Sequence, residues 1–229
     1  MNCLPALVIE TSTPAASVAL VRGNGEIGRL DFSSDRSHNA ALFQPLGELI
    51  ARLAGEKPRR LLVGSGPGSY SGTRVGIAAA QGVAIASGCP AVAVPSILAV
   101  PAADHGRSCL AIGDARRGSF WTAGISENQL RTPPVLTDRD GLLREIEAAL
   151  ARDSTVFSLE DVSKFPLPPE MLRLISVEKP DAARLWRAWQ ATPSAVREKW
   201  SAEIAQPMYL KPPHITPAKR SWLVAPGNP

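Results

Sequence analysis

The chain has 229 residues, of which 45% are apolar and 20% charged, and its formal net charge is +4. This length allows one large domain or two small ones, and the apolar fraction is high enough for a buried core. No apolar run reaches the ~18 residues that a membrane span needs, and the first residues lack the basic start and long apolar stretch of a signal peptide. We therefore expect a cytoplasmic protein without membrane contact. The three cysteines indicate neither a disulfide framework nor a thiolate metal site, because their number is odd and no two have Cys-x-x-Cys spacing.

The first 32 residues predict an antiparallel meander. Three β-like runs, at 6–13, 17–21 and 26–32, are separated by short turns. The pair Asn24-Gly25 between the second and third runs is typical of a tight hairpin. We therefore expect three consecutive strands that pair as neighbours.

An amphipathic helix is predicted over 37–54. Four leucines recur there at spacings of four, three and four residues, namely Leu42, Leu46, Leu49 and Leu53. This period places them on one face of a helix, and Phe43 and Ile50 on the adjoining edge make the apolar stripe wide. Pro45 removes one backbone donor, so we expect a kink in the first turns.

A βαβ crossover is predicted next, with strands over 61–64 and 91–94 and a helix over 73–87 between them. The loop before the helix has glycines at 64, 66, 68 and 72, which permit positive φ and close approach of another backbone. Such a loop suits an anion, a partner's backbone or simply a tight connection, and it matches neither the Walker A nor the dinucleotide-binding pattern. Small residues in the helix allow close packing on the protein's own sheet or on another subunit: Gly76, Ala79, Ala80 and Gly82.

The second half of the chain starts again with a β hairpin. Its two runs lie at 108–112 and 119–125. Thr137 and Asp140 are placed as a capping pair for the helix that follows. Three helices are expected in this half, over 139–151, 181–191 and 194–204.

The residues offer little catalytic chemistry. The histidines, His38, His105 and His214, lie far apart in sequence and lack the spacing of a helical metal site. For a phosphotransferase, Glu10 would hold water or Mg²⁺ and the hydroxyls of 11–13 would hold phosphate. The second half of such a nucleotide clamp is missing, because no glycine occurs between positions 141 and 227. A serine nucleophile is not indicated either, because the glycine loop contains no Gly-x-Ser-x-Gly arrangement.

Several stretches resemble the TsaB (YeaZ) family, the non-catalytic subunits of bacterial N6-threonylcarbamoyladenosine synthesis in tRNA. They occur in the family's order. The first is 9–13 with 17–20, the second 37–38, the third 66–77 with 81–82, the fourth 114–116 with 118, and the fifth 207–211. Together they extend over nearly all of residues 6–211, and the glycine segment is long enough to be specific. Glu10 stands where the family usually has Asp, and Gly113 precedes Asp114 where an isoleucine is more usual.

The resemblance implies an α/β fold of two lobes, with the actin-like and Hsp70-like (ribonuclease H-like) architecture of mixed sheets flanked by helices. Residues 1–100 would form an N-terminal actin-like lobe with partner-binding helices. Residues 101–229 would form a smaller second lobe with C-terminal helices and an extended basic tail. The family's catalytic relative, TsaD, holds a metal through a His-x-x-x-His pair that this sequence lacks. The resemblance therefore implies an accessory subunit without a complete active site, metal or cofactor.

The resemblance also implies the partners. They are a TsaD-like catalytic subunit and a TsaE-like ATPase, with a homodimer when the chain is alone and with only indirect contact to tRNA. In the family the two N-terminal helices form a helical bundle with the partner, which assigns the interface to Leu42, Leu46, Leu49, Leu53, Gly76, Ala79, Ala80 and Val83. Two alternatives stay open. One is an independent sugar or acyl kinase of the same superfamily, and the other is a tRNA-binding module that acts through the basic tail, with Lys211, His214, Lys219 and Arg220.

Overall fold

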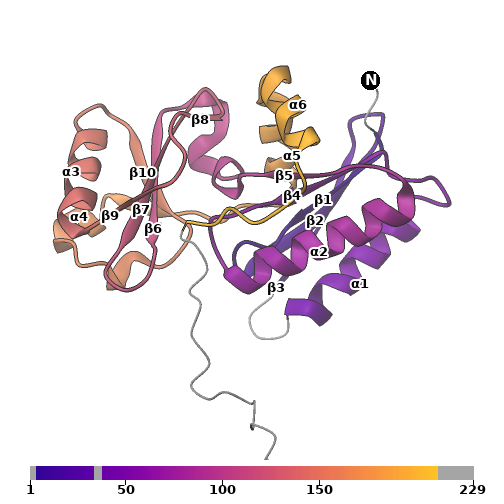
Figure 1. Ribbon diagram of the computed structural model, residues 1–229, viewed down its shortest axis with the longest axis horizontal. Helices are drawn as coiled ribbons and strands as arrows, with labels where there is room; N and C mark the ends of the chain where they lie inside the picture. Colours follow the sequence, from indigo (N-terminus) through magenta and orange to yellow (C-terminus); the bar gives the residue numbers. More distant parts are fainter. Residues whose placement is uncertain (1–3, 34–37, 211–229) are drawn as a thin grey trace, which may run out of the picture.

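The computed structural model describes residues 4–33 and 38–210, apart from the side chains of residues 38–40 and 105. Two lobes lie next to each other along the long axis of the molecule, and each is built on one mixed sheet with helices packed on it (Figure 1). This arrangement confirms the predicted α/β class with two lobes, mixed sheets and flanking helices. The basic tail and the side chains of all three histidines lie outside the described residues.

The first lobe is built on a five-stranded sheet. Its strands are β1 (Ala6–Glu10), β2 (Ala15–Val21), β3 (Ile27–Ser33), β4 (Arg60–Gly64) and β5 (Ala91–Val94). Their order is β3-β2-β1-β4-β5, with antiparallel pairing in the β1-β2-β3 part and parallel pairing from β1 to β4 and β5. The predicted meander and the predicted parallel crossover are therefore both confirmed.

Two long helices cover one face of this sheet, α1 (His38–Ala51) and α2 (Tyr70–Ser87) (Figure 1). Helix α2 begins three residues earlier than predicted because Ser69 caps it: the Ser69 Oγ accepts a hydrogen bond from the Gly72 amide at 3.2 Å. The helix ends at Gly88, whose φ of 70° lies in the left-handed region that glycine adopts at helix ends. Pro45 lies inside α1. Within the described ranges, no helix is both long and apolar enough to cross a membrane.

The second lobe repeats the pairing pattern of the first. Its sheet has the order β11-β10-β6-β7-β8, with β6-β7 antiparallel and β6-β10-β11 parallel, while β9 also pairs with β7. The elements of this lobe are β6 (Cys109–Asp114), β7 (Phe120–Ser126), β8 (Gln129–Leu130), β9 (Val135–Thr137), α3 (Arg139–Leu150), β10 (Thr155–Ser158), α4 (Pro169–Leu172) and β11 (Ile175–Val177). The predicted hairpin is confirmed. The predicted cap is wrong, because α3 is capped by Asp138, whose side chain accepts a hydrogen bond from the Gly141 amide at 2.8 Å.

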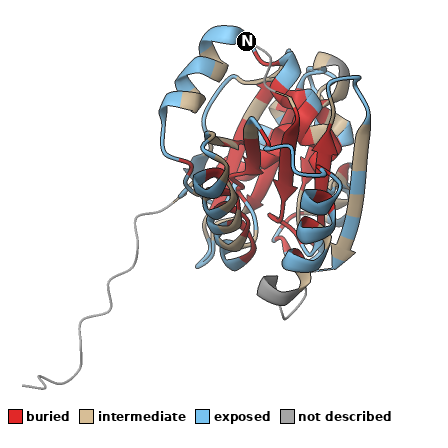
Figure 2. Ribbon diagram, turned by 90° about the vertical axis from the view of Figure 1, so that its right-hand side faces the viewer, coloured by how far each residue is buried: buried red, intermediate tan, exposed pale blue. Residues whose placement is uncertain are grey.

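The C-terminal helices belong in space to the first lobe, which corrects the prediction that they lie in the second. Helices α5 (Ala182–Ala191) and α6 (Ser194–Ala202) lie on the face of the first sheet opposite α1 and α2 (Figure 1). Leu185, Trp186 and Trp189 of α5 are buried against apolar strand residues such as Val8 and Leu62. Both faces of the first sheet are therefore covered. Strands β1, β2 and β4 are almost entirely buried between helices whose outer surfaces are exposed, whereas the edge strand β3 is partly exposed (Figure 2).

Candidate functional site

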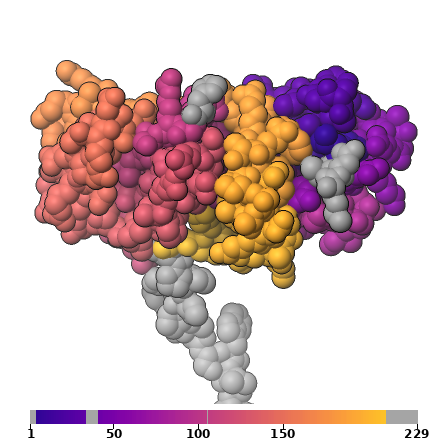
Figure 3. Space-filling model, turned by 90° about the horizontal axis from the view of Figure 1, so that it is seen from above, coloured from indigo at the N-terminus to yellow at the C-terminus, as the bar shows by residue number. Residues whose placement is uncertain are grey.

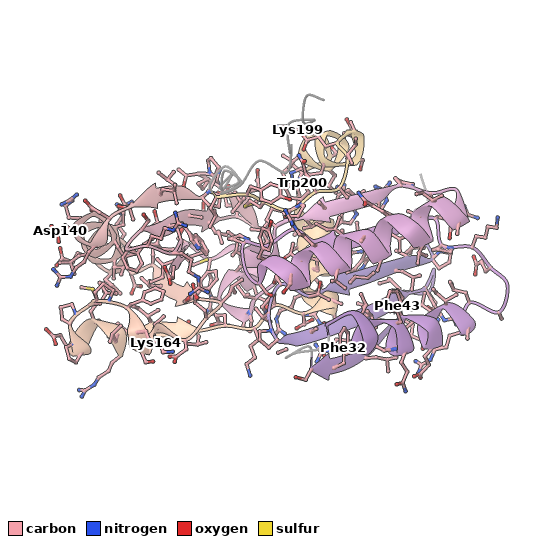
Figure 4. All side chains as sticks on the ribbon, turned by 60° about the horizontal axis from the view of Figure 1, so that its bottom comes forward. Phe32, Phe43, Asp140, Lys164, Lys199 and Trp200 are labelled. Atoms are coloured by element: carbon pink, nitrogen blue, oxygen red, sulfur yellow. The ribbon has the colours of Figure 1, made fainter. Side chains whose placement is uncertain are left out.

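An apolar groove runs between α1 and α2 on the outer surface of the first lobe. Its volume is about 620 Å³, and both helices line it, α1 with Phe43, Gly47 and Ile50 and α2 with Ala79, Gly82 and Val83. The Phe43 side chain is 59% exposed and that of Ile50 39% exposed, which is unusual for apolar residues of this size. Figure 4 shows Phe43 on α1, with α2 running alongside. A contiguous exposed apolar surface of this kind indicates a binding surface.

The four leucines predicted as partner contacts on α1 have little or no exposed surface. The four leucines of the stripe are buried in the core of the chain itself, and Leu42 and Leu49 have no exposed surface at all. The leucine period therefore marks the face that α1 turns toward its own sheet. Of the four, Leu46 also lines the groove, although only 3% of its surface is exposed.

The predicted positions on α2 divide between the two faces of that helix. Gly76 and Ala80 are buried against the sheet, and a Cβ atom added at Gly76 would lie 2.2 Å from Thr11 Oγ1. Ala79 and Val83 are half-buried and line the groove. Ala79 and Val83, with the edge of Leu46, are thus the predicted residues that remain accessible to a partner.

Other groove residues were not among the predicted contacts. Phe43 and Ile50 are two helical turns apart beside the leucine stripe, and the excess width of that stripe was the signal that could have assigned them. A Cβ atom added at Gly82 would meet nothing within 4 Å, so this glycine leaves open surface on α2. Sequence alone does not distinguish Gly76 from Gly82, because both lie among small residues of the same helix.

A second hollow, of about 830 Å³, lies between the two lobes. The first lobe lines it with Ser12, Thr13 and the start of α2, and the second lobe with Asp114 and Glu160. The segment 207–210 lines it as well. Figure 3 shows the yellow C-terminal part of the chain, which includes α5 and α6, in the middle of the view beside the indigo first lobe.

Glu10, the predicted ligand of water or Mg²⁺, does not line this cleft. Its side chain has no exposed surface, and its Oε1 accepts a hydrogen bond from the Ser12 amide at 2.7 Å. Its Oε2 has no hydrogen-bond partner among the described residues. Burial raises the pKa of Glu10, and the hydrogen bond from the Ser12 amide together with the nearby hydroxyls of Ser12 and Ser96 opposes this rise only in part. Glu10 is therefore a buried carboxyl rather than a group open to a ligand.

The glycine loop packs on the turn that joins β1 and β2. A Cβ atom at Gly68 would lie 2.3 Å from the Ser12 carbonyl oxygen, and one at Gly72 would lie 2.3 Å from that of Thr11. The Ser69 amide donates a hydrogen bond to the Ser12 carbonyl at 2.6 Å. These contacts support the interpretation of the loop as a tight connection in which glycine permits close approach within the chain itself.

The second lobe lines the cleft with a small network of charged groups. Arg116 forms an ion pair with Asp114 at 3.1 Å, and Glu160 Oε1 accepts a hydrogen bond from the Asp114 amide at 2.6 Å. Burial raises the pKa of Glu160, against the opposing effects of that amide and of Arg116. Among the described residues, no group of three or more His, Cys, Asp or Glu side chains is arranged to hold a metal ion.

Two separate motifs of the sequence meet where the cleft adjoins the groove. The guanidinium of Arg74, from the glycine segment, lies 3.9 Å from the centre of the Tyr70 ring and 5.6 Å from that of Tyr209. Arg74 Nη2 also donates a hydrogen bond to the Tyr209 hydroxyl at 3.0 Å. Arg74 lines both hollows, so the groove and the cleft share one residue.

Known proteins resemble the chain in sequence and in structure. It is 29% identical over 138 residues to the tRNA threonylcarbamoyladenosine biosynthesis protein TsaB of Haemophilus influenzae, and 31% identical over 130 residues to the TsaB protein of Escherichia coli. These alignments cover 58% and 54% of the chain. A solved structure of YeaZ from Pseudomonas aeruginosa superposes with a TM-score of 0.66 and covers 90% of this chain and 99% of its own, at 22% identity. The chain is similar in sequence to TsaB proteins and shares the fold of YeaZ.

The sequence matches to the TsaB proteins are partial. The chain spans 58% of the length of the Haemophilus TsaB protein and 55% of the Escherichia coli one. Residues 33–131, from the end of β3 to beyond β8, also match the family model described as TsaD, tRNA N6-adenosine threonylcarbamoyltransferase. That match includes α1 and α2, the helices that form the groove.

Proposed function

We propose that this chain is a non-catalytic subunit of the complex that adds threonylcarbamoyl to adenosine 37 of tRNA. Its role is to bind a TsaD-like catalytic subunit and to stabilise that subunit's active arrangement. The names of the TsaB relatives support the pathway, and the match to the TsaD model supports the class of partner. The single observation that carries the proposal is the exposed apolar groove between α1 and α2.

The groove has the properties of a surface for a partner helix. Phe43 and Ile50 supply large apolar side chains, and complete burial of the exposed part of Phe43 would contribute up to about 2 kcal/mol. Ala79 and Gly82 on α2 are small enough for a second helix axis to approach closely. The two helices thus place large apolar side chains on one side of the groove and small residues on the other. A third helix can pack into a surface of this shape.

The proposal includes the other members of the complex. A TsaE-like ATPase acts with the TsaD-like subunit, and two copies of the chain associate through the same groove when the catalytic subunit is absent. The chain has no turnover of its own, works in the cytoplasm and contacts tRNA only through the complex. The TsaB names do not favour the alternative of an independent kinase. Calorimetric titration of the purified chain with Mg-ATP would reopen that alternative if it revealed micromolar binding.

Two arginines introduced into the groove test the proposal. In the double variant Gly47→Arg and Gly82→Arg, both side chains project from exposed positions at which a Cβ atom meets nothing within 4 Å. The fold should therefore persist while bulk and charge fill the groove. We expect the TsaD-like subunit of the same organism to be retained by the unchanged chain in a pull-down and to be lost with the double variant.

The matched control is Gly23→Arg, in the turn between β2 and β3, where a Cβ atom is equally unobstructed and which does not line the groove. This variant should retain the partner. If the double variant, still folded by circular dichroism, retained as much partner as the unchanged chain, the groove would not be the binding surface.

A further inference from the structure

We propose that Arg74 selects the partner by pairing with a carboxylate on the helix that occupies the groove. The inference rests on the proposed function and adds the chemistry of the occupant: an apolar helix face with an Asp or Glu at the end that lies next to the interlobe cleft. Arg74 is the single charged residue among the described residues that line the groove. The groove thus combines an apolar surface with one cation at its edge.

The guanidinium of Arg74 is held in place but is not neutralised. The rings of Tyr70 and Tyr209 lie on it, and the Tyr209 hydroxyl accepts one of its hydrogen bonds. In the described part of the chain, no carboxylate lies within ion-pair distance of this side chain. The remaining N–H groups of the planar fork are available to a ligand, in a geometry that suits a carboxylate.

Covering the groove makes such a carboxylate necessary. A helix that seats on Phe43 and Ala79 removes water from the adjoining end of the groove, where Arg74 lies. A cation that loses water without gaining an anion is costly, and this cost penalises every partner that lacks the carboxylate. Apolar packing therefore supplies attraction, and Arg74 supplies discrimination between partners.

The test measures the affinity of the full chain for the TsaD-like subunit by calorimetry at low and high salt. Arg74→Gln should weaken binding about tenfold, because the partner's carboxylate then has no cation to pair with. Arg74→Glu should weaken binding more strongly, because that carboxylate then faces a like charge. Arg74→Lys should give an intermediate affinity, since an ammonium keeps the charge and loses the planar fork. Binding of the unchanged chain should weaken as salt rises, and Arg74→Gln should reduce that salt dependence.

Two further variants separate this inference from general damage. Arg144→Glu reverses an exposed arginine on α3, outside the groove lining, and should leave the affinity unchanged. Tyr209→Phe keeps the ring and removes only the hydroxyl that positions Arg74, so it should weaken binding less than Arg74→Gln.

Each outcome bears on one proposal. If the unchanged chain does not bind the TsaD-like subunit, the proposed function fails. If the unchanged chain binds, and both Arg74→Gln and Arg74→Glu bind as tightly as it does with the same salt dependence, the carboxylate inference is overturned. The proposal that the groove binds the partner is then unaffected. If Arg74 affects only self-association of the chain in sedimentation measurements, the occupant is a second copy and the inference about the TsaD-like partner is likewise overturned.

Discussion

Glu10 is the residue whose burial has the clearest consequence for stability. It is fully buried, one of its oxygens has no hydrogen-bond partner among the described residues, and its pKa is raised by burial. The folded chain therefore holds this proton at pH values where the unfolded chain, with a pKa near 4.5, has released it. Because the folded state binds more protons in that window, the contribution of Glu10 to stability falls as the pH rises above 4.5.

Glu10→Gln should remove this pH dependence. We expect the free energy of unfolding of the unchanged chain to include a component that decreases from about pH 4.5 upward, and the variant to lack it, because an amide of similar shape does not ionise in this range. Urea unfolding at a series of pH values measures the difference. Glu56→Gln, at an exposed position, is the control and should follow the unchanged chain. Identical pH profiles for the Glu10 variant and the unchanged chain would contradict the prediction.

At the scale of single elements, hydrophobic periodicity predicted helix α1 but did not distinguish its buried leucines from its exposed apolar residues. The leucine period reports that one face is buried, and the same pattern results whether the burying surface is the chain's own sheet or a partner. The leucines cover the sheet, and the surplus residues Phe43 and Ile50 form the groove. Helix existence is therefore readable from local spacing, whereas the choice between core and interface depends on the three-dimensional packing.

The short strands of the second lobe were not predicted, for a related reason. β10 and β11 have four and three residues, and both are strands because they extend the sheet from β6 in parallel. Such pairing connects residues far apart in the chain, and a local pattern of this length carries no information about it. The cap of α3 is a smaller case: Thr137, Asp138 and Asp140 all had suitable chemistry, and the geometry of the chain selected Asp138.

Helix α2 contains two glycines whose replacement by alanine should have opposite effects. At Gly82 a Cβ atom enters open space, so Gly82→Ala should stabilise the chain by up to about 1 kcal/mol through helix propensity. At Gly76 a Cβ atom would lie 2.2 Å from Thr11 Oγ1, so Gly76→Ala should destabilise the chain by about 1 to 3 kcal/mol through overpacking.

Urea unfolding of both variants checks the pair, since the two sites share one helix and the same substitution. Equal shifts of the unfolding midpoint in the same direction would contradict the close packing of Gly76 against Thr11.

At the scale of the whole molecule, the first lobe is discontinuous in sequence. The Asp181 amide donates a hydrogen bond to the Ala99 carbonyl at 3.2 Å, so the chain returns after the second lobe to the point at which it left the first. At the same place the pKa of Asp181 is lowered: burial alone would raise it, but hydrogen bonds from Arg184 and the charge of Arg29 outweigh burial. Sequence order alone suggested a boundary at residue 100, because nothing local indicates that α5 packs on strands so far upstream.

A fragment of residues 1–100 should therefore fail to fold cooperatively. It lacks Leu185, Trp186 and Trp189, and one face of its sheet, with Val8 and Leu62, would be exposed to water. Joining residues 1–99 directly to 181–210 through a short glycine-serine linker should restore a cooperative thermal transition by circular dichroism, since the two ends adjoin. A cooperative transition in the shorter fragment would show that α5 and α6 are dispensable to this lobe.

Because α5 lies late in the sequence, the first lobe can complete its packing only late in translation. The five strands of the first sheet leave the ribosome with one apolar face bare, and its cover emerges only after the entire second lobe has been translated. Throughout that interval the nascent chain presents a surface that chaperones recognise, although α1 and α2 have already emerged. The sheet that supports α1 and α2 is complete only once α5 has been released, so under the proposed function assembly with a catalytic subunit would follow completion of this lobe rather than accompany its translation.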